Sequence, residues 1–168
     1  MKWITREHVH VDRVACPWLI RRFVDHDAEL IFCPPGEVDR KAAELGAIPF
    51  DVVGVELTHR DGKCSFDAIM EKYGLNDEAL AELAVIVRAA DTNAFDLAHE
   101  SVGLEAIASG SMMIVEGDQD AISKGTYLYD SLYAYCKLRR IKERYAGDLE
   151  KMSGPQRWAF LREKVAHD

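Results

Sequence analysis

The segment from His8 to Asp25 holds the densest set of side chains that could bind a ligand or react. Cys16 stands directly before Pro17, and proline favours the first turn of a helix, so we expect a helix from Pro17 to about Asp25. A helix N-terminus and nearby guanidinium groups both stabilise a thiolate, which makes Cys16 a candidate nucleophile. The alternative is that Cys16 is a small, buried apolar side chain.

Three arginines accompany this expected helix start: Arg13, Arg21 and Arg22. Guanidinium groups beside a helix N-terminus are suited to hold an oxyanion, and this is the role that we predict for them. The alternative for Arg21 is a surface ion pair with Asp25, four residues further on.

His10 is a candidate metal ligand. We expect a short strand over 9–11, on which His8 and His10 would share one face and Asp12 would continue the row. Imidazole binds many transition metals, although two histidines at this spacing also occur without a metal.

A second polar segment contains Glu56, His59 and Cys64. The pair Asp61-Gly62 indicates a tight turn, which would deliver Cys64 to the start of the next helix and give it the same environment as Cys16. On a straight strand Glu56 and His59 would point to opposite sides, so their convergence requires a bulge or bend. The alternative is that His59 is an exposed loop residue.

Asp91 ends a row of apolar residues at helical spacing, Leu80, Leu83, Ala84 and Val87. A carboxylate at the edge of a core must be hydrogen-bonded, paired or bound to a metal. Its alternatives to a metal are a buried arginine or the turn at Thr92-Asn93.

The strand and helix patterns around these residues predict a helix-dominant α+β fold. In it, a strand-containing N-terminal half packs against a mostly helical C-terminal half. The other expected strands are 29–32 and 48–57. The expected helices cover 37–45 (ending at Gly46), 65–73 (with Ser65 as N-cap), 77–90, 102–109, 121–145 and 156–165. Gly125 is expected to weaken or offset the start of the helix over 121–145. With 168 residues and no long linker, a single domain over 1–168 is expected.

Composition excludes several classes of function. The net charge of −8 disfavours attraction to nucleic acid or an anionic membrane, and there is no apolar run of about 20 residues and no signal segment, so we expect a cytoplasmic protein. The basic run 137–144 is then a solvated helix face or a homodimer contact. The four scattered cysteines indicate neither a zinc knuckle nor a disulfide scaffold, and nucleotide-binding and common hydrolase motifs are absent.

Several runs of residues, taken together, resemble the chromate-resistance family, the C-terminal domain of the regulator ChrB, which also occurs alone or joined to a rhodanese-like domain. These runs are 9–25, 47–60, 64–67, 86–92 and 129–136, and the similarity extends over about 3–138. The positions that match the family pattern are Asp12, Arg13, Cys16, Trp18, Arg21, Arg22, Glu56, His59, Cys64 and Asp91. No counterpart of the N-terminal half, to which DNA-binding regulation is ascribed, and no rhodanese domain is present, so we expect neither promoter binding nor sulfur transfer.

The family and the residues together lead to one main hypothesis, a polar cleft that binds a metal ion or an oxyanion such as chromate in a stress response. Its expected metal ligands are His10, Glu56, His59 and Asp91, a set that suits Zn²⁺, Mn²⁺ or Fe²⁺. Arg13, Arg21 and Arg22 would face the oxyanion, and Cys16 or Cys64 would supply a thiolate for redox chemistry. The alternatives are a non-catalytic sensor that forms a homodimer and a metal-dependent hydrolase.

Overall fold

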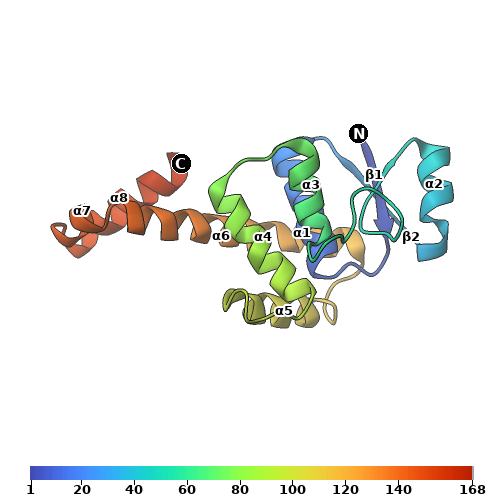
Figure 1. Ribbon diagram of the computed structural model, residues 1–168. Coiled ribbons are helices and arrows are strands. Elements are labelled where there is room, and N and C mark those ends of the chain that lie inside the picture. Colours follow the sequence, from blue (N-terminus) through green and yellow to red (C-terminus); the bar gives the residue numbers. More distant parts are fainter. Residues whose placement is uncertain (168) are drawn as a thin grey trace.

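The computed structural model describes residues 1–167, and Asp168, the last residue of the expected domain, lies outside them. Helices form most of the molecule, and a small parallel sheet lies at one end of it (Figure 1). The strands are β1 (Lys2–Arg6), β2 (Glu29–Cys33) and β3 (Ile48–Pro49), in the order β2-β1-β3. This confirms the predicted helix-dominant α+β fold.

The first two helices alternate with the strands, and the others follow β3. They are α1 (Val11–Leu19), α2 (Val38–Leu45), α3 (Ser65–Tyr73), α4 (Glu78–Asp91), α5 (Glu100–Ser111), α6 (Asp118–Arg144), α7 (Ala146–Glu150) and α8 (Gly154–His167). A π-helical turn, Ile20–Val24, continues α1, and a 3₁₀ turn, Pro35–Glu37, precedes α2. None of the helices within residues 1–167 combines the length and apolar character needed to cross a bilayer.

The expected helix boundaries hold where local capping decides them. Helix α2 ends at Gly46, whose φ of 61° is the left-handed conformation that glycine adopts readily. Helix α4 begins after Asp77, whose side chain accepts a hydrogen bond from the backbone N–H of Leu80. Helix α3 ends at Tyr73 as predicted, and its N-cap is Cys64, one residue before the predicted Ser65.

The first 20 residues differ from the prediction. The expected strand over 9–11 is absent, β1 was not predicted, and α1 begins at Val11 with Pro17 in its interior. Val11, Ala15 and Leu19 are fully buried and recur every four residues, so one face of α1 packs into the core. This packing outweighs the backbone hydrogen bond that Pro17 cannot donate.

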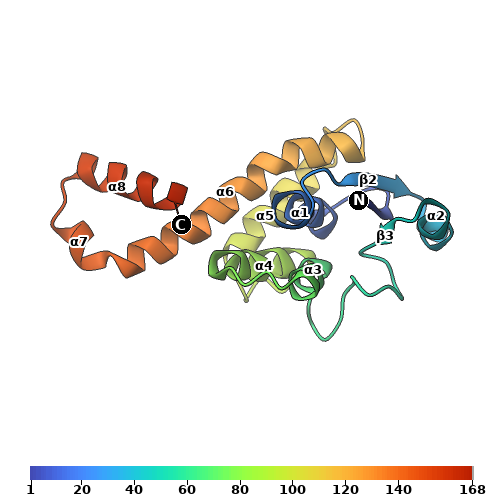
Figure 2. The ribbon, with the colours of Figure 1, turned by 90° about the horizontal axis from the view of Figure 1, so that it is seen from above.

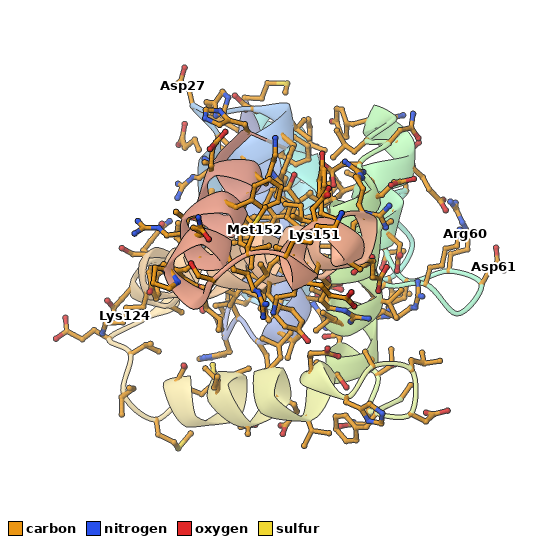
Figure 3. The ribbon with its side chains drawn as sticks, turned by 90° about the vertical axis from the view of Figure 1, so that its left-hand side faces the viewer. Asp27, Arg60, Asp61, Lys124, Lys151 and Met152 are labelled. Carbon is orange, nitrogen blue, oxygen red and sulfur yellow. The ribbon has the colours of Figure 1, made fainter. Side chains whose placement is uncertain are left out.

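The expected strand 48–57 is also much shorter, because only Ile48–Pro49 pairs with β1. The chain then follows an irregular loop, residues 50–64, in which Asp51, Gly54, Asp61 and Gly62 have positive φ. This loop carries His59, and Figure 3 shows Arg60 and Asp61 at the outer edge of the molecule.

Helix α1 is the central element and packs against α3, α4 and α6 (Figures 1 and 2). Trp18 stacks on Phe66 with ring centroids 6.4 Å apart and meets the ring of Tyr133 edge-on at 5.8 Å. At the contact between α1 and α6, a Cβ atom added to Gly125 would lie 2.4 Å from Val14 Cγ1. Gly125 therefore permits the close approach of these two helices, and it lies inside α6 rather than offsetting its start.

The second half of α6 extends away from this body, and α7 and α8 fold back along it (Figures 1 and 2). We call residues 137–167 the arm. Its own small core contains Ile141, Leu149 and Leu161, separate from the core around α1.

Candidate functional site

Three carboxylates surround the imidazole of His59. Its Nε2 atom lies 3.2 Å from Asp91 Oδ2 and 3.3 Å from Asp51 Oδ1. The same nitrogen is 3.5 Å from Asp12 Oδ2. We call these four residues the His59 cluster; they come from α1, the end of α4 and the 50–64 loop, so residues far apart in sequence form one polar site.

Asp12 is fixed by the helix that it caps. Its Oδ2 accepts a hydrogen bond from the backbone N–H of Ser65 at 2.8 Å, and its Oδ1 accepts one from the N–H of Phe66 at 3.1 Å. Both donors belong to the first turn of α3, where backbone N–H groups have no partner within the helix. A buried carboxylate in the first turn of α1 thereby satisfies the N-terminus of α3 and is held in one orientation.

Asp51 is held by neighbouring cations and a hydroxyl. Its Oδ2 accepts hydrogen bonds from Arg6 Nη2 at 2.9 Å and Arg13 Nη1 at 3.2 Å, and its Oδ1 accepts one from Ser65 Oγ at 2.9 Å. Arg6 Nε also donates to the Asp51 carbonyl oxygen. Two guanidinium groups thus balance this carboxylate, and it needs no further cation.

Asp91 is the least balanced carboxylate of the cluster. Burial raises its pKa to about 6, and the negative charge of Asp12 adds to that rise, whereas His59 opposes it. Its nearest cationic group is the imidazole itself. The ionised form of Asp91 therefore depends on a positive group beside it.

The pKa of His59 is also raised, and in a histidine this favours the charged form. Hydrogen bonding to Asp12 is the largest cause that raises its pKa to about 9, and the charges of Asp12, Asp91 and Asp51 add to it. Its side chain is 42% exposed, so the cluster opens to solvent at the imidazole. Without another cation, His59 is the positive partner of Asp12 and Asp91.

Two of the four expected metal ligands do not reach this cluster. Glu56 is exposed and forms an ion pair with Lys72 Nζ at 2.8 Å. His10 lies beside α5, with Nε2 3.5 Å from Ser109 Oγ. His59 and Asp91 do come together, because the loop bends, but the bend carries Asp51 rather than Glu56 to the site.

The three expected oxyanion-binding arginines also separate. Arg13 belongs to the His59 cluster through Asp51. Arg21 donates to the carbonyl oxygen of Ala28, and Arg22 Nε lies 4.0 Å from Asp130 Oδ1. Arg21 and Arg22 line a pocket of about 150 Å³ with Trp18, His26 and Asp130, apart from the His59 cluster.

The two candidate nucleophiles lack the environment expected of a thiolate. Cys16 lies inside α1 rather than at its start, and burial together with the charge of Asp12 raises its pKa well above the ordinary value. Cys64 does lie at a helix start, as N-cap of α3, yet burial and the charges of Asp12 and Asp67 raise its pKa as well. Burial first, and then the neighbouring carboxylates, oppose a thiolate at both residues, and a nucleophilic role for either stays a prediction.

Asp12 and Asp51 complete the cluster, and neither was among the expected ligands. The expected strand over 9–11 directed attention to the histidines, whereas in α1 Asp12 faces the core. Asp51 directly follows Phe50 at the carboxyl end of a parallel strand, the edge where ligands commonly bind in such sheets. The position of Asp51 just beyond a strand that pairs with the central strand β1 is therefore the signal that marks it.

The cluster has the donor atoms of a cation site. One atom each from Asp12, His59 and Asp91 can be chosen so that all lie within 4.8 Å of one another. Ligand atoms at ~2.1 Å from one metal ion, at tetrahedral or octahedral angles, are separated by ~3.0–3.4 Å. The measured separations from His59 Nε2 to Asp91 and Asp12, 3.2 and 3.5 Å, are close to this range.

Comparisons with known proteins give one consistent result. The family described as "ChrB, C-terminal domain" matches residues 3–136. The chain is 34% identical over 135 residues to "Protein ChrB" of Cupriavidus metallidurans, an alignment that covers 80% of this chain and 40% of that protein. No solved structure gives a significant match.

Proposed function

Since the chain belongs to the family of ChrB C-terminal domains of chromate resistance, we propose that it serves this response by binding a divalent metal ion at the His59 cluster. Asp12, His59 and Asp91 are the ligands in this proposal. Asp51 lies beside them as a carboxylate already balanced by Arg6 and Arg13. The observation that carries the proposal is the convergence of two carboxylates and one imidazole from three separate segments.

The charge of the cluster favours a cation. When His59 is neutral, Asp12 and Asp91 are left with no positive side chain between them, and the burial of unbalanced charge is costly. A divalent ion supplies the two positive charges that these two carboxylates lack. It also accepts the lone pair of Nε2, which a protonated His59 does not offer.

Hydrogen bonds to the proposed ligands favour a metal site of fixed geometry. The backbone N–H groups of Ser65 and Phe66 fix the carboxylate of Asp12, as outer hydrogen bonds commonly do for metal ligands. Two carboxylates and one imidazole form a hard-to-intermediate ligand set, which suits Mn²⁺, Fe²⁺ or Zn²⁺.

The same electrostatics disfavour a bare oxyanion at this place. Three carboxylates repel an anion such as chromate, and Arg13 already donates to Asp51 and to the carbonyl oxygen of His8. The Arg21–Arg22 pocket holds a single carboxylate, that of Asp130, and Arg22 is 58% exposed there, so an oxyanion would be repelled less in this pocket than at the His59 cluster. We therefore propose the His59 cluster for the metal ion alone.

Calorimetric titration of Mn²⁺ and Zn²⁺ into chelator-treated protein tests the proposal. We expect one ion per chain for the wild type and at least ~10–100-fold weaker binding for Asp91→Asn and His59→Ala. Glu56→Gln and His10→Gln are matched controls, since they alter the same residue types outside the cluster, and should bind as the wild type does. Equal binding by wild type and His59→Ala, or no binding by either, would contradict the proposal.

A further inference from the structure

Helix α5 presents an apolar surface to solvent. Apart from Ser109, its exposed positions carry apolar residues or glycine, as do the exposed positions 113 and 114 of the turn after it, although a surface helix ordinarily directs charged side chains outwards. We call this surface the α5 face; it comprises Val102, Gly103, Ala106, Ile107, Met113 and Ile114. Val102 is 54% and Met113 80% exposed. Contiguous exposed apolar residues of this kind mark an interaction surface.

The surroundings of the α5 face are acidic. Between Arg88 and Lys124 the chain contains no Lys or Arg and seven Asp or Glu. Glu105 belongs to α5 itself, and Glu116 is exposed just beyond it. The α5 face is thus an apolar surface with a negative border.

The arm has the complementary character. Trp158 on α8 is 63% exposed and borders two grooves, of about 490 and 440 Å³, each of which also contains Leu138 and Leu161. Lys142 and Arg157 line the first groove, and Arg162 lines the second. In Figure 3, which views the molecule along the arm, Lys151 and Met152 of its outer turn lie near the centre and α5 crosses below them.

The division of charge follows the boundary of the family match. Residues 1–136 contain 12 Lys or Arg against 24 Asp or Glu, whereas the arm, 137–167, contains nine against four. The family model ends at residue 136. The arm is therefore a basic extension of an acidic domain. Arg139 and Arg140 already pair with Glu100, Glu78 and Glu82 of the same chain, so the charge offered to another copy is that of the groove residues Lys142, Arg157 and Arg162.

We propose that the arm of one copy covers the α5 face of a second copy. Charge selects this pairing, because two α5 faces would bring acidic borders together and two arms would bring basic ones together. If each copy gives one arm and receives one, the contact occurs twice and closes a two-fold dimer. The apolar grooves around Trp158 then receive side chains such as Val102, with Arg157 and Arg162 near acidic residues. This inference is independent of the cation site.

Sedimentation of the full chain over a wide range of concentration measures the contact. We expect the wild type to dimerise, and Trp158→Glu and Val102→Glu each to raise the dissociation constant by ~30-fold or more, as for a central interface residue. Both side chains are exposed, so thermal melting should show that each variant is folded. Val53→Glu is the matched control, because Val53 is 92% exposed and lies in the 50–64 loop. This variant should dimerise as the wild type does.

Mixing the two variants identifies the pairing. Trp158→Glu retains an intact α5 face and Val102→Glu retains an intact arm, so their mixture restores one of the two contacts and should associate more tightly than either variant alone. A wild type that stays monomeric at all concentrations would overturn the proposal. So would a mixture that does not associate, or association lost in Val102→Glu alone, which would indicate contact between two α5 faces.

Discussion

The His59 cluster and the arm place their charges in contrasting ways. In the cluster, carboxylates from three segments lie close together and interact with the N-terminus of α3, two arginines and one imidazole. In the arm, basic side chains spread over the surface of two helices around exposed Trp158 and a core with few buried residues. The cluster concentrates charge of one sign, and the arm distributes charge of the other.

This difference predicts different responses to substitution. A buried carboxylate that satisfies backbone donors cannot be removed without leaving those donors unpaired. An exposed basic or aromatic side chain can be replaced with little effect on folding, so its removal reports on association instead. Substitutions in the two regions should therefore differ in which property they change, stability in the cluster and association in the arm.

The largest expected effect comes from Asp12→Ala. It leaves the N–H groups of Ser65 and Phe66 without their acceptor, and we expect the free energy of unfolding in urea to fall by about 3 kcal/mol. Asp61→Asn, on a side chain that is 88% exposed and at a positive φ that asparagine also adopts, should change it by less than about 0.5 kcal/mol. Equal stability of the Asp12 variant and the wild type would refute the capping role.

Leu161→Ala should produce a comparable loss that is confined to the arm. Leu161 is buried in the small core of the arm, and its truncation should cost about 2–3 kcal/mol there. Hydrogen exchange should show faster exchange in α8 while the amides of α1 and α3 keep their protection. The matched variant Leu83→Ala, in the main core, should instead accelerate exchange throughout the body.

The third prediction concerns pH, in the absence of metal. The pKa of His59 is raised from 6.5 to about 9, so the stability that its charge provides is complete below about pH 6.5 and is lost as pH rises through 9. The pKa of Asp91 is raised from 3.8 to about 6, so its ionisation destabilises the fold as pH rises through 6.

Both residues therefore lower the melting temperature as pH rises from about 4 to 9. Thermal melting in chelator should show this decline, with the upper part flattened in His59→Gln and the lower part flattened in Asp91→Asn. A saturating divalent ion should reverse the upper trend, because it competes with the proton on His59. Identical profiles for all three proteins would contradict the assigned pKa directions.

The smallest effect is expected for Glu56→Gln. Its ion pair with Lys72 is exposed, and such pairs contribute less than about 1 kcal/mol. We expect unfolding free energy to change by no more than about 0.5 kcal/mol and metal affinity to stay at the wild-type value. A large loss of affinity would mean that the 50–64 loop rearranges to bring Glu56 into the site.

The sequence allowed prediction of those elements whose ends are set locally. Gly46 and Asp77 fix the end of α2 and the start of α4 through their own backbone and side-chain preferences. The site depends on packing between segments that are far apart in the chain. By local preference Pro17 predicts a helix start, but the packing of α1 into the core places Pro17 inside that helix. Once α1 begins at Val11, Asp12 faces α3 and Cys16 is buried.

The 50–64 loop shows the same limit. Only the paired residues of β3 are extended, and positive φ at Asp51 turns the following chain so that its carboxylate meets His59. Residue type alone does not distinguish Asp51 from Glu56 as the one that turns inwards, and the difference is that Asp51 follows the carboxyl end of β3. The sequence predicts Asp91 because a carboxylate at the end of an apolar row needs a partner, and His59 because a bend in its segment brings it to a shared site.

X-ray diffraction from crystals of the full chain soaked in Mn²⁺, with anomalous scattering from the metal, tests the central claim most directly. The account predicts an anomalous peak bounded by Asp12, His59 and Asp91, with His59 Nε2 within bonding distance. A peak at another place, or occupied Mn²⁺ sites on the surface with none at the His59 cluster, would contradict it.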